Sequence, residues 1–181
     1  MQGFLWLLNS GDPLPFDLLA KNPKDCETTK QEWKSILSAN DYSLSDPSVI
    51  PQLAKLLTVE EFDLRLATAT ALQRFHTPAA VIHLGKILDT PLVEKKLAIV
   101  AAKGLAEFAN GRPMTTSGSI RTPADNFPHC DDKFPFRTYE TDANSWPNPD
   151  VPGDDDRHIS YWKAWWVSNS VRVAALAAQQ P

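Results

Sequence analysis

The sequence predicts an all-α domain, and two internal matches lead to this prediction. Residues 47–57 match residues 78–88 without gaps at an offset of 31. Residues 66–75 match residues 99–108 at an offset of 33, with small and apolar residues at corresponding places. A recurring unit of about 30 residues with two helices is typical of an α-solenoid. We therefore expect two helix pairs in this part of the chain.

Length and composition are those of one globular domain. The chain has 181 residues, 43% of them hydrophobic and 22% charged, which argues against wholesale disorder. A chain of this size buries a core without metals or disulfides. The net charge is -4 and the densest basic run is Lys95-Lys96, so we expect no nucleic-acid binding, which needs clustered cations.

The start of the chain is predicted to be an extended arm followed by a capping helix. Residues 1–27 contain three prolines and two glycines, and their apolar run at residues 4–8 is far shorter than the roughly 20 residues of a transmembrane helix. We expect no transmembrane segment and no intact signal peptide. A helix begins near Thr29, where residues 29–32 (Thr-Lys-Gln-Glu) fit the capping box.

The first helix of each predicted pair follows a capping residue. Thr77 precedes Pro78, and either Asp46 or Ser48 precedes the first segment. Pro51 falls in the first turn if Ser48 is the cap. In the second helices small residues let neighbouring helices approach closely, while Leu and Phe side chains fill the layer between pairs.

These features carry a family resemblance. Residues 46–110 resemble HEAT-like repeats of the short class that is also found in bilin lyases. The element at residues 63–65 (Asp-Leu-Arg) resembles the Asp and Arg that join neighbouring HEAT turns. The second unit departs from this pattern, because residues 94–96 are Glu-Lys-Lys. The resemblance implies a short HEAT-like solenoid of antiparallel helix pairs within residues 28–110.

Two further segments complete the predicted domain. Residues 111–157 contain seven prolines and three glycines but also five aromatic residues, so we predict an ordered loop that wraps the helices. A Trp-rich helix over residues 158–181 is expected to cap the last repeat, and three preceding aspartates favour its N-terminus. Its apolar face is predicted to comprise Ile159, Trp162, Trp166, Val173 and Leu176.

Candidate chemistry is sparse. The cluster at residues 129–132 (His-Cys-Asp-Asp) favours a polar turn over a zinc site, because adjacent ligands are awkward at one ion. The acidic run at residues 154–156 favours helix capping over calcium binding. No nucleophile elbow, phosphate-binding loop or dinucleotide fingerprint is present. We expect no metal, no cofactor and no enzymatic activity.

The two cysteines leave the location of the protein open. Cys26 and Cys130 both lie in polar, loop-like surroundings, so they are candidates for a disulfide. Two reduced thiols in a cytoplasmic protein are the alternative. The aromatic, Pro-rich late loop favours a periplasmic or secreted protein.

The leading functional hypothesis is a non-catalytic protein-binding or scaffolding module. Tyr161 and Trp165 are the predicted contact residues, because we expect Trp165 to be partly exposed and such aromatics anchor interfaces. The resemblance also implies a concave surface that carries Arg65, Arg74, Lys96 and Lys103. The alternative is a bilin-lyase-like or chaperone-like protein that acts on a bound ligand, as the same resemblance implies.

Overall fold

The part of the chain that the computed structural model describes is entirely helical in its regular structure. It comprises residues 34, 37, 47–109 and 152–179. Within these residues no strand occurs, which confirms the all-α prediction. The predicted N-terminal arm, and the predicted Pro-rich loop up to residue 151, lie outside the described residues.

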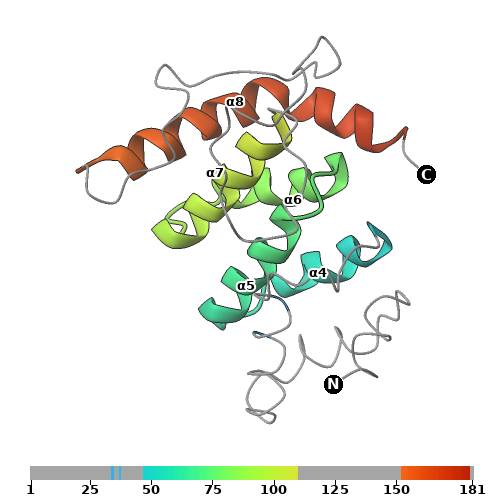
Figure 1. Cartoon of the computed structure of the whole chain (residues 1–181), viewed down its shortest axis with the longest axis horizontal. Coiled ribbons are helices and arrows are strands. Elements are labelled where there is room, and N and C mark those ends of the chain that lie inside the picture. The colour runs from blue at the N-terminus through green and yellow to red at the C-terminus, as the bar shows by residue number, and fades with distance from the viewer. Residues whose placement is uncertain (1–33, 35–36, 38–46, 110–151, 180–181) are drawn as a thin grey trace, which may run out of the picture.

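The described helices form three tiers. In chain order they are η1 (Pro47–Val49), α4 (Ile50–Leu56), α5 (Phe62–Gln73), α6 (Pro78–Asp89), α7 (Lys95–Ala109) and α8 (Asp154–Ala177). Figure 1 shows α4 and α5 in the lower tier, α6 and α7 in the middle, and α8 lying across them. Because α6 contacts both α7 and α8, and α5 contacts α7, one hydrophobic core extends from α4 to α8.

The first helix pair begins differently from the prediction. Ser48 is not the N-cap, since it lies in the short 3-10 helix η1, and Asp46 is outside the described residues. Val49 occupies the N-cap of α4, with no side-chain hydrogen bond. Pro51 does lie in the first turn of α4, where a backbone N–H has no intrahelical partner in any case. A preceding turn of 3-10 helix therefore replaces the expected polar cap.

The start of α6 agrees with the prediction. The Thr77 hydroxyl accepts a hydrogen bond from the Ala80 N–H at 3.4 Å, and Pro78 is the first helical residue. The helix ends at Asp89 because Thr90 is extended, as the residue before Pro91 prefers to be. Leu92 follows with a φ of 56° and a fully exposed side chain.

The second helices, α5 and α7, are longer than the segments that match in sequence. They begin at Phe62 and Lys95, each four residues before its matched segment. In α5 the buried Thr68 hydroxyl donates to the Leu64 carbonyl at 2.7 Å, so this polar group has a partner inside the Ala-rich helix.

Helix α8 begins at Asp154, four residues before the predicted boundary at residue 158. The left-handed Gly153, with a φ of 83°, directs the chain into the helix. Three aspartates then occupy the first turn, where negative charge complements the helix dipole. The Lys95 ammonium lies 2.9 Å from an Asp156 carboxylate oxygen, which links the starts of α7 and α8.

Candidate functional site

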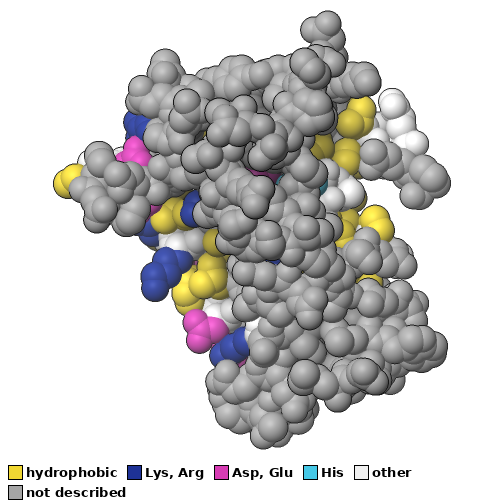
Figure 2. Space-filling model, in the orientation of Figure 1, with side chains coloured by type: hydrophobic (Ala, Val, Ile, Leu, Met, Phe, Trp, Pro, Cys, Tyr) yellow, Lys and Arg dark blue, Asp and Glu magenta, His cyan; other side chains and the backbone are white. Residues whose placement is uncertain are grey.

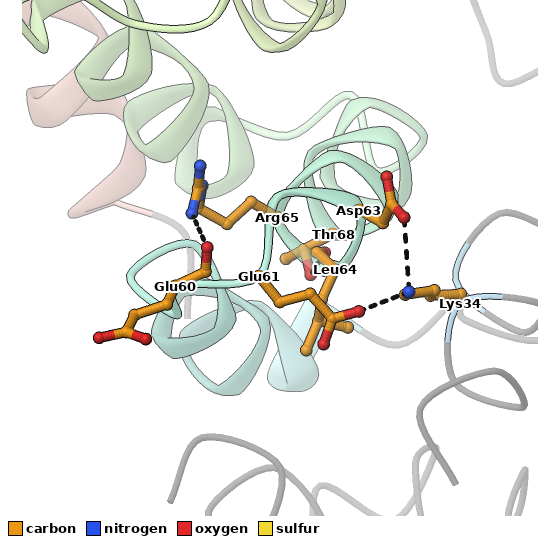
Figure 3. Close-up of polar contacts among 7 residues, drawn as sticks. All are labelled: Lys34, Glu60, Glu61, Asp63, Leu64, Arg65 and Thr68. Carbon is orange, nitrogen blue, oxygen red and sulfur yellow. Dashed lines mark hydrogen bonds and ion pairs between the residues drawn. The ribbon is translucent and has the colours of Figure 1, made fainter. Parts of the chain in front are cut away.

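The Arg65 guanidinium joins the two helix pairs. It donates to the carbonyl oxygens of Val59 and Glu60, each at 2.8 Å, and it also pairs with the carboxylate of Glu94 (Figure 3 shows the Glu60 contact). Glu94 directly precedes α7, as Glu61 directly precedes α5. The second unit lacks the Asp-Leu-Arg pattern, but the carboxylate directly before its second helix accepts from the arginine of the first unit.

A second ion pair involves Lys34. Its ammonium lies 2.5 Å from a Glu61 oxygen and 3.5 Å from an Asp63 oxygen (Figure 3). The hydrogen bond with Glu61 is the main reason that the pKa of Lys34 is raised. Lys34 precedes Arg65 by 31 residues, and its longer contact, with Asp63, spans 29 residues as the Arg65–Glu94 pair does, whereas its closer contact, with Glu61, spans 27. The matched sequence segments begin at residue 47 and do not include Lys34, so they did not predict this contact.

The four cations predicted for a concave surface lie in different surroundings. Arg65 is engaged between the helix pairs, and Arg74 is half-buried at the end of α5. Lys103 is half-buried on α7 and close enough to α8 to affect His158. Lys96 is exposed at the start of α7. A role of these cations in binding a partner stays a prediction.

The inner face of α8 docks into a slot on α6. The indole of Trp166 lies against the backbone at Gly85, where an added Cβ would be 2.2 to 2.5 Å from three ring atoms. The indole Nε1–H donates to a carboxylate oxygen of Asp89 at 2.8 Å. Because Gly85 and Asp89 are one helical turn apart, α6 supplies both the space for the ring and the acceptor for its N–H.

The slot predicts that Gly85→Ala destabilises the protein by about 1–2 kcal/mol. Overpacking costs about 1–3 kcal/mol, while the better helix propensity of Ala returns up to about 1 kcal/mol. Urea unfolding followed by circular dichroism measures the difference. Gly104→Ala is the matched control, because its closest neighbour is the flexible Leu84 methyl, and we expect a smaller loss there. Equal losses at the two glycines would contradict the slot.

The expected exposure of Trp165 is wrong. Only 8% of this residue is exposed, and its ring lies 5.6 Å from that of Trp162. Tyr161 is half-buried and packs edge-to-face on Trp162 at 5.2 Å. Trp165 and Trp166 are adjacent and both buried, so the inner face of α8 is wider than a single stripe. A contact role for Tyr161 and Trp165 stays a prediction.

A histidine is buried on the same inner face. His158 is 3% exposed and packs edge-on against Trp162. Burial is the main reason that its pKa is lowered to about 4. The positive charges of Lys103 and Arg157 lower the pKa further, whereas Asp154 and Asp155 oppose them. At neutral pH the imidazole is therefore neutral.

The opposite side of α8 carries an unusual solvent-facing surface. We define the outer face as six exposed residues: Ser160, Ala164, Val167, Val171, Ala174 and Ala178. Val167 is 67% exposed and Val171 is 80% exposed. In Figure 2 hydrophobic side chains reach the surface over the C-terminal half of α8, at the upper right. Asp156, Lys163, Ser168 and Arg172 are also exposed on α8, so the outer face is an apolar stripe within a mixed solvent-facing surface.

Other candidate features either find no counterpart in the described residues or lie outside them. No three His, Cys, Asp or Glu side chains within the described ranges lie together as a metal site would require. Of the helices from η1 to α8, none is long and apolar enough to cross a membrane. Cys26, Cys130 and the cluster at residues 129–132 are outside the described residues, so the disulfide stays a prediction.

Comparison with known proteins gives no relative from which a function follows. No family model, no curated protein and no solved structure matches the chain.

Proposed function

We propose that the protein is a non-catalytic binding module in which HEAT-like helix pairs support a presenting helix, α8. The ion pairs of Lys34 and Arg65 support a HEAT-like stack, because each cation contacts a carboxylate at the start of a second helix, α5 for Lys34 and α7 for Arg65. The Trp166 slot supports the presenting role, since it fixes α8 on the second helix pair. In this proposal the repeats are the scaffold and α8 carries the binding surface.

The observation that carries the proposal is the outer face of α8. A helix that only caps a repeat needs one apolar face, and the inner face already provides it. Two valines that are more than half exposed on the opposite side gain nothing from this packing. Apolar residues arranged on one helical face and facing solvent are a recurrent mark of protein interaction sites.

Capture from a native extract tests this proposal. We expect the full-length protein to retain one or more proteins specifically, and Val171→Glu to abolish this retention by placing a charge in the outer face. Thr58→Glu is the matched control, because it adds the same charge at an exposed site in the α4–α5 turn. Recovery of the same proteins by the wild type and Val171→Glu would reject the outer face as the binding surface.

A further inference from the structure

We draw no further inference here: the strongest candidate, the apolar stripe of Val167 and Val171 on the solvent-facing side of α8, belongs to the binding surface already proposed, and nothing in the described part of the chain shows what covers it.

Discussion

Trp166→Ala is expected to lower the free energy of unfolding by about 3–5 kcal/mol, the usual cost of removing a buried Trp or Phe ring. Trp166 is 5% exposed, and its ring fills the space above Gly85 that no Cβ occupies. Its removal leaves a cavity between α6 and α8 and also deletes the hydrogen bond to Asp89. Urea unfolding followed by circular dichroism measures the loss. If α8 detaches separately, the transition measured with a second probe does not coincide with the one measured by circular dichroism.

The neighbouring residue supplies the control for this prediction. Val167→Ala removes an apolar side chain that is 67% exposed, so we expect a change within about 0.5 kcal/mol. Trp166→Phe keeps most of the buried ring but loses the N–H, and it should fall between the two. If Trp166→Ala costs no more than Val167→Ala, the ring does not hold α8 on the repeats.

The sequence predicted those parts of the fold that depend on local rules. Thr77 and Pro78 start a helix because cap and proline act within one turn, and this needs no tertiary information. The burial of Trp162 and Trp166 followed from their spacing on one helical face. The start of α4 was predicted less well, because Pro47 allows a 3-10 turn before the α-helix and the turn displaces the cap.

The candidate site was harder to predict because its decisive residues act across the fold. In the sequence Gly85 is one glycine within a predicted helix. Only the position of α8 shows that the absence of a Cβ at Gly85 leaves space for the indole of Trp166. The spacing of the outer face around Val167 and Val171 is present in the sequence, but Ala and Ser fit either a buried or an exposed face. Trp165 was assigned the wrong environment for a related reason, since the width of the inner face depends on the helices beneath it.

Stability of the protein should depend on pH through His158. The folded state lowers the pKa of this histidine from 6.5 to about 4, so between these values the unfolded chain binds a proton that the folded chain excludes. The free energy of unfolding therefore falls as the pH is lowered through this window, and rises as the pH is raised. Above the window both states are neutral at His158, and below it both are charged, so no further change arises from this group.

The total loss from this one group is on the order of 3 kcal/mol, since each unit of pKa difference corresponds to about 1.4 kcal/mol. Carboxylates titrate near the lower end of the same window, so the wild-type curve alone does not isolate the histidine. His158→Gln is a polar replacement that cannot titrate, and the difference between the two curves reports His158 directly. We expect urea unfolding at a series of pH values to give a shallower slope for this variant between pH 6.5 and about 4.

Parallel curves would mean that the imidazole is protonated in the folded state as readily as in the unfolded chain. Burial against Trp162, together with the charge of Lys103, argues for divergence, because both disfavour a second positive charge beneath α8.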